Sequence, residues 1–300
     1  QRWIAIPGSE TAEIQRSQQE YSTFPDGTVL VKHLRLPQKS GSFLNLETQI
    51  LHLDQGQWNP YSYLWDESGK DAQLIDSIGA NRPLQLSPDK EMPIDKTWHV
   101  GARNECRMCH NAGSHFVLGF VPDQLDRNVQ IAGVTKKQID FLTDQRIMAT
   151  PESVGADKTV LLVDPHDSTQ DINDRARSYL HVNCSMCHHP RGSAIVSFYL
   201  RRELPFDDLN TNKGTGIGTF GMRNARIIVP GDPYRSVLMY RMSKLGYARM
   251  PYIGSQVVDS KAVALMDQWI RSLAADNDEP NSNPLIEGSK EALGLATLMT

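Results

Sequence analysis

No apolar run in the 300 residues of the sequence approaches the roughly 18 to 20 residues that a membrane-spanning helix needs. We therefore expect no membrane span in this chain. Positive charge is not in excess, because 31 Lys and Arg residues face 35 Asp and Glu residues, for a formal net charge of −4. Nucleic-acid binders usually present a concentrated basic surface, so nucleic acid is excluded as the main partner. A hydrophobic content of 39% and a charged content of 22% are typical of a protein that buries an ordinary core.

Cysteine is scarce, and all four cysteines fall in two copies of one pattern, Cys106-Arg-Met-Cys109-His110 and Cys184-Ser-Met-Cys187-His188. This is the pattern of c-type haem attachment. Two cysteines three residues apart on one helical turn project to the same side and can form thioethers with the vinyl edge of one porphyrin. The histidine that follows is then held beneath the iron. We predict two covalently bound haem c groups, with thioethers from Cys106, Cys109, Cys184 and Cys187 and with His110 and His188 as proximal iron ligands.

Other uses of paired cysteines explain the pattern less well. A structural zinc site usually has its two pairs closer together in sequence, and it needs no histidine directly after each pair. Two disulfides would not place a histidine at the same offset twice. A thioredoxin-like motif needs a pair that opens a helix in a βαβ unit, and the sequence around these pairs shows no such alternation.

The first hundred residues are rich in β-branched and apolar segments bounded by Pro, Gly and Asp. These segments predict strands over residues 27–36, 46–53, 57–65 and 96–100 and hence a small antiparallel β domain. Beyond Cys106 the pattern changes to helix and loop. It predicts helices over residues 135–148, with Thr135 as N-cap, over residues 173–182, and after Asp259, a second candidate N-cap.

Four units follow from this organisation. We expect a β domain over residues 1–100, a first haem domain over 101–170, a second over 171–275, and a polar linker with the start of a further helical segment over 276–300. The chain starts at Gln1 without a leader, and its last segment stops without a helix cap. We expect that a leader or a larger N-terminal part precedes it and that the other end is cut as well.

Residues 171–275 run from a helix through a haem motif and loops to a closing helix, and this order resembles a class I cytochrome c. The segment Arg249-Met250-Pro-Tyr-Ile-Gly254 resembles the Met-Pro-Pro-Leu-Gly type of loop of that family. The resemblance implies that the sulfur of Met250 is the distal ligand of the second haem. Met250 is one of ten methionines, so core packing is the alternative. The turn residues beside it favour a loop and therefore a ligand.

The whole layout resembles a family of uncharacterised bacterial dihaem c-type cytochromes, including planctomycete-type cytochromes. The segments that carry this resemblance are Gly27-Thr-Val-Leu-Val-Lys32, Glu47-Thr48, Tyr63-Leu-Trp65, Leu118-Gly-Phe120, Gln124-Leu-Asp-Arg127, Ala176-Arg-Ser-Tyr-Leu180 and Val229-Pro-Gly-Asp-Pro233. The resemblance implies an α+β multidomain fold, in which a small antiparallel β domain precedes two mostly α-helical cytochrome c-like haem domains. Since no activity is firmly attached to the family, it supports the architecture more than the chemistry.

Several residues are candidates for the sixth ligand of the first haem. Met148 is our first candidate, because a short helix that ends in methionine before Ala-Thr-Pro resembles a truncated distal loop. Core packing explains Met148 equally well. His166 and His99 are the other candidates, whereas His115 is too close in sequence to His110 to reach the opposite face easily.

Haems with His and Met ligands are saturated, have a raised reduction potential and move single electrons. We therefore expect an electron-transfer module that exchanges electrons with redox partner proteins, including a fused or associated dehydrogenase. Attachment of such haems outside the bacterial cytoplasm implies a periplasmic or extracellular location. The alternative is a dihaem peroxidase-like oxidoreductase with an open sixth position at the first haem. In a third interpretation the β domain binds carbohydrate or protein.

Overall fold

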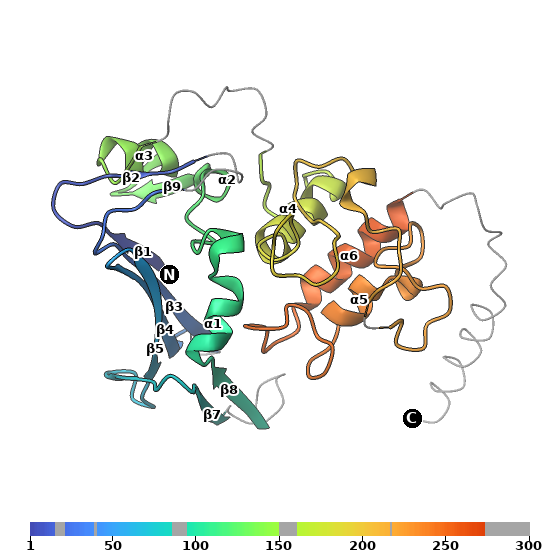
Figure 1. Ribbon diagram of the computed structural model, residues 1–300, viewed down its shortest axis with the longest axis horizontal. Helices are drawn as coiled ribbons and strands as arrows, with labels where there is room; N and C mark the ends of the chain where they lie inside the picture. Colours follow the sequence, from blue (N-terminus) through green and yellow to red (C-terminus); the bar gives the residue numbers. More distant parts are fainter. Residues whose placement is uncertain (16–21, 39–40, 86–94, 150–160, 217, 274–300) are drawn as a thin grey trace.

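The computed structural model places the N-terminal sheet on one side of the molecule, the last third of the chain on the other side, and helix α1 between them (Figure 1). It describes residues 1–15, 22–38, 41–85, 95–149, 161–216 and 218–273. The predicted segment 276–300 lies outside these residues. No helix in the described ranges is long and apolar enough to cross a membrane, in agreement with the sequence.

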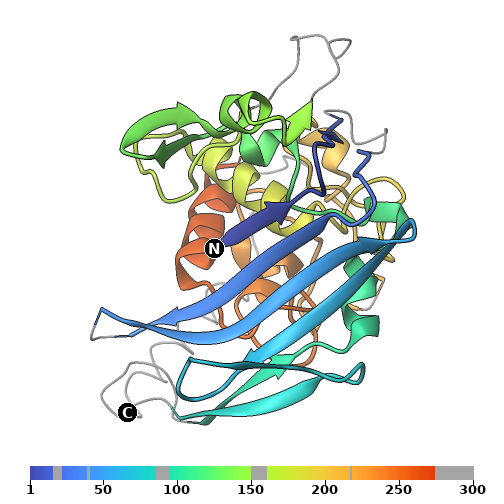
Figure 2. The ribbon, with the colours of Figure 1, turned by 90° about the vertical axis from the view of Figure 1, so that its left-hand side faces the viewer.

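Five antiparallel strands form the main sheet in the order β1-β3-β4-β5-β6. They are β1 (Arg2–Ala5), β3 (Val29–Pro37), β4 (Phe43–Asp54), β5 (Gln57–Trp65) and β6 (Ala72–Leu74). The turn between β4 and β5 is Gln55-Gly56, with positive φ at both residues (51° and 73°), as a two-residue hairpin turn requires. Figure 2 shows this sheet face on, with its long strands running diagonally across the molecule. The strands predicted in this region are therefore present.

Shorter strand pairs complete the β structure. A hairpin of β7 (Ala80–Gln85) and β8 (Asp95–Val100) leads to the first cysteine motif. A second hairpin joins β9 (Asn128–Ile131) to β10 (Val134–Lys137). The short strand β11 (Met148–Ala149) pairs in parallel with β2 (Ala12–Glu13), so the N-terminus packs on the segment that follows the first motif.

The predicted fold class is wrong, because the chain after the sheet does not form two mostly α-helical domains. The described residues contain six α-helices, of which the longest have 13 residues. These are α1 (Arg103–Cys109), α2 (Pro122–Leu125), α3 (Gln138–Asp144), α4 (Ile172–Cys184), α5 (Val237–Met242) and α6 (Ser260–Ser272). Loops and short strands make up the rest, since Gly, Pro and other turn residues interrupt the apolar periodicity.

The helix predicted over residues 135–148 illustrates the reason. Thr135 lies in β10 and pairs with Gln130 across the hairpin, so it does not cap a helix. The hairpin turn Ala132-Gly133 has positive φ at both residues, 49° and 79°. Only the middle of the predicted range is helical, as α3, and the end of the range is β11. Helix-like apolar spacing over a short stretch does not outweigh such a turn.

Helices α4 and α6 pack on each other and hold the core of the last third of the chain. Asp171 caps α4 by accepting hydrogen bonds from the N–H groups of Asn173 and Asp174. Asp259 caps α6 by accepting one from Ala262, as the sequence predicted. Fully buried residues of this core include Leu180, Ile228, Met266, Trp269 and Ile270. Because α4 ends at Cys184, this core positions the second motif.

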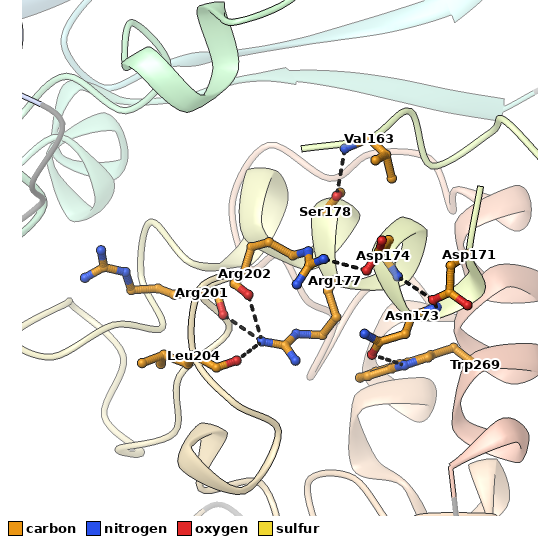
Figure 3. Close-up of polar contacts among 10 residues, drawn as sticks. All are labelled: Val163, Asp171, Asn173, Asp174, Arg177, Ser178, Arg201, Arg202, Leu204 and Trp269. Carbon is orange, nitrogen blue, oxygen red and sulfur yellow. Dashed lines mark hydrogen bonds and ion pairs between the residues drawn. The ribbon is translucent and has the colours of Figure 1, made fainter. Parts of the chain in front are cut away.

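A buried arginine of α4 forms hydrogen bonds to the loop that follows the second motif. Arg177 is 3% exposed, and its Nη2 donates to the carbonyl oxygens of Arg201 (2.9 Å), Arg202 (3.3 Å) and Leu204 (2.6 Å) (Figure 3). Beside it Arg202 forms an ion pair of 2.5 Å with Asp174. The guanidinium thus donates hydrogen bonds to carbonyl groups of a loop that belongs to no strand. Hydrogen bonds of this kind are charge-assisted and are among the stronger ones in proteins.

Replacing Arg177 with alanine should lower the free energy of unfolding by about 3 kcal/mol, because it removes a buried guanidinium together with its charge-assisted hydrogen bonds to three half-buried loop carbonyls. Urea unfolding of the full chain measures the change. Arg271→Ala is the matched control, since the Arg271 side chain is 45% exposed and its partners are the surface residues Asp267 and Tyr234. It should cost at most about 0.5 kcal/mol. Equal losses in the two variants would contradict the role assigned to Arg177.

Candidate haem-attachment sites

Both cysteine motifs form the same local turn. In the first, Cys106 and Cys109 lie in the last turn of α1, and the N–H of His110 donates to the carbonyl of Cys106 (2.9 Å). In the second, Cys184 ends α4, and the N–H of His188 donates to its carbonyl (3.0 Å). Each motif therefore places its two cysteines on one helical turn with the histidine directly after it, as haem attachment requires. All four cysteines are free thiols.

The imidazole of His110 is held in one tautomer. Its Nδ1 lies 2.6 Å from the carbonyl oxygen of Phe116, so Nδ1 carries the proton and donates. Burial lowers the pKa of His110, so the ring is neutral at neutral pH, although the Phe116 carbonyl opposes this shift. A neutral imidazole with a donating Nδ1 has a free lone pair on Nε2, the usual arrangement of a metal-binding histidine.

The imidazole of His188 is buried and stacks on Phe198, with ring centroids 4.1 Å apart. Burial is the main cause that lowers its pKa to about 4, and the charges of Arg241 and His189 add to it. Its buried Nδ1 is without a hydrogen-bond partner among the described residues. Unlike His110, whose Nδ1 bonds to the Phe116 carbonyl, His188 therefore has no hydrogen bond among the described residues that fixes its tautomer.

The cysteine thiols differ in their surroundings. The pKa of Cys184 is raised to about 12, mainly by burial. Burial also raises that of Cys106, helped by the carboxylates of Glu47 and Glu105. Cys109 and Cys187 act as a pair, because their sulfurs lie 3.8 Å apart, within hydrogen-bond distance for thiols. This contact raises the pKa of Cys109 and lowers that of Cys187.

The tertiary structure brings the two motifs into contact. The Sγ atoms of Cys109 and Cys187 lie 3.8 Å apart, although the residues are 78 positions apart in sequence. No periodicity or motif in the sequence indicated this contact, because each motif is a purely local signal.

The loop that carries Met250 links the two motifs. The N–H of Met250 donates to the carbonyl of Arg241 (2.9 Å), and Arg241 lies close enough to His188 for its charge to lower that pKa. Further along the loop, Gln256 makes two hydrogen bonds of 2.6 Å to the backbone N–H and C=O of His99. His99 precedes the first motif, so the loop is fastened at both ends. In Figure 1 it reaches from α5 toward α1 and β8.

Met148, in contrast, is part of another core. Its side chain is 1% exposed and packs with residues none of which belongs to either motif, namely Ala12, Ile14, Leu125, Ile139 and Leu142. The structure therefore does not bring Met148 to His110. Its predicted role as distal ligand stays a prediction that packing does not support.

The other candidate histidines for the first haem lie in different surroundings. His166 is exposed. His99 contacts Asn81 and Glu105, each at 2.8 Å. His115 lines a cavity of about 80 Å³ together with His189, Ser185 and Met186 of the second motif. The sequence did not indicate this cavity, because its walls come from three segments that are far apart in the chain, within residues 15–22, 114–124 and 181–189.

Over the described ranges, no group of three or more His, Cys, Asp and Glu side chains could hold a metal ion. Haem attachment makes no such demand, since one histidine and two cysteines per motif suffice. Comparison of the chain with protein-family models, with curated proteins and with solved structures gave no match.

Proposed function

We propose that this protein is a dihaem c-type cytochrome that transfers single electrons. The observation that carries the proposal is the repeated turn, in which each motif closes a hydrogen bond from its histidine N–H to the carbonyl of its first cysteine. Two neutral, buried imidazoles at the same offset from two paired thiols fit the donor set of haem c. Cys106, Cys109 and His110 would hold one haem, and Cys184, Cys187 and His188 the other.

Bound haem supplies a reversible one-electron couple. The chain's own residues orient and protect it. The Phe116 carbonyl fixes the His110 ring, and the Phe198 ring packs on that of His188. Arg241 holds the Met250 backbone near the second motif, which supports Met250 as the distal ligand there. We infer a periplasmic or extracellular location and redox proteins, including an associated dehydrogenase, as partners.

The intact mass of protein matured in a host with cytochrome biogenesis tests the proposal. We expect the mass of the polypeptide plus two haems that survive denaturation, because thioethers are covalent. Cys184→Ala combined with Cys187→Ala should remove one haem and leave the other, which controls for adventitious binding. Bare polypeptide in such material would overturn the proposal.

A second candidate function is reduction of peroxide at the first haem. The observation that favours it is that Met148 packs in a core that contains no residue of the first motif, which does not support Met148 as the sixth ligand there. A resting optical spectrum with and without peroxide separates the candidates. A high-spin component that reacts with peroxide favours the peroxidase-like oxidoreductase, and two inert low-spin haems favour the electron carrier.

A further inference from the structure

The contact between the motifs joins equivalent positions. Cys109 and Cys187 are both the second cysteine of their motif, and their sulfurs are 3.8 Å apart. Gly113 and Arg191 are both the third residue after the motif histidine. A Cβ atom at Gly113 would lie 2.5 Å from the carbonyl oxygen of Arg191, so these loops also touch. Contacts between equivalent residues are what a local two-fold relation between the motifs produces, as in an isologous interface.

From this pairing we infer that the two motifs hold their haems as one coupled pair, which meets at the thioether sulfurs of Cys109 and Cys187. The inference rests on the proposed function. In a c-type haem each of these sulfurs would be bonded to the carbon of a former vinyl group, which joins it to the edge of its porphyrin. Sulfurs in van der Waals contact therefore bring two macrocycle edges together, and sulfur is polarisable. An electron that enters at one haem can then pass to the other within the protein.

Contacts that involve no cysteine hold the motifs in this arrangement. The two hydrogen bonds between Gln256 and the backbone of His99 join the Met250 loop to the segment before the first motif. The sulfur contact is thus one part of a wider interface rather than an isolated approach of two side chains.

Circular dichroism in the Soret region tests the inference on the mature full chain. Two coupled haems give a pair of bands of opposite sign, whereas independent haems give the sum of their separate spectra. The reference is the sum for two variants that each lack one motif, with both cysteines and the histidine replaced by alanine. We expect the spectrum of the full protein to contain a two-signed component that this sum lacks.

Gly113→Ala provides a second test that leaves every haem-binding residue in place. The added methyl group must push the backbone of Arg191 away, which separates the motifs. Exciton coupling falls with the cube of the distance between transition dipoles, so the two-signed component should weaken while both haems remain. Gly214→Ala is the matched control, because nothing lies within 4 Å of a Cβ at Gly214.

The outcomes separate the inference from the proposed function. Two haems by mass with an additive spectrum would overturn the coupled pair and leave the cytochrome assignment intact. Two haems with a two-signed component that is equal in Gly113→Ala and in the wild type would also overturn it. Fewer than two haems by mass would overturn the proposed function and this inference with it.

Discussion

Replacing Met250 with alanine should turn the second haem high-spin and lower its reduction potential. A thioether ligand favours ferrous iron, so its loss stabilises the ferric state. Axial ligation sets haem potentials over roughly 0.8 V, and we expect a decrease on the order of tenths of a volt. The weak near-infrared band of a sulfur-to-iron charge transfer should disappear as well. Optical spectroscopy and a redox titration measure both effects.

Two controls accompany Met250→Ala: one replaces a different methionine with alanine, and the other places a different ligand at position 250. Met239 packs against the α4 and α6 core, so Met239→Ala removes a methionine without removing a ligand. It should cost stability and leave the spectrum unchanged. Met250→His should restore a low-spin haem at a lower potential than the wild type. An unchanged spectrum in Met250→Ala would remove the ligand assignment, whatever the stability of the variant.

Replacing His188 with alanine should abolish the second haem and destabilise the last third of the chain. The His188 ring packs on Phe198 beside the α4 and α6 core, and a porphyrin bound there would add a large apolar group to that core. We expect a loss on the order of 3 to 5 kcal/mol, which is in the range of large core truncations and of a ligand bound only to the folded state. Thermal unfolding followed by far-UV circular dichroism measures it.

His189 offers a neighbouring control, because its Nδ1 makes a local contact of 2.8 Å with the carbonyl oxygen of the adjacent Pro190. His189→Ala should keep both haems by mass and should change stability by less than about 1 kcal/mol. If His188→Ala retained a haem held by Cys184 and Cys187 with an unchanged spectrum, His188 would not be the proximal ligand. If His189→Ala lost the haem instead, His189 and not His188 would be the proximal ligand.

The sequence predicted features whose cause is local. It predicted the strands on both sides of the Gln55-Gly56 turn, and it predicted Asp259 as the cap of α6, where its carboxylate accepts from the N–H of Ala262. The haem motifs belong to the same class, since a short pattern and one helical turn define each of them. Sequence reasoning failed where two local signals competed, as at the Ala132-Gly133 turn inside an otherwise helix-like stretch.

The residues alone therefore determined where the cysteines and histidines stand relative to each other within each motif, because backbone hydrogen bonds over four residues are enough to arrange them. Only the tertiary structure decided which residues of the two motifs contact each other. It placed Cys109 against Cys187, buried Met148 with Ile14 in a core that contains no residue of either motif, and joined Gln256 to His99 by hydrogen bonds. Such contacts join segments separated by tens of residues, and they depend on how whole elements pack, which no short pattern in the chain encodes.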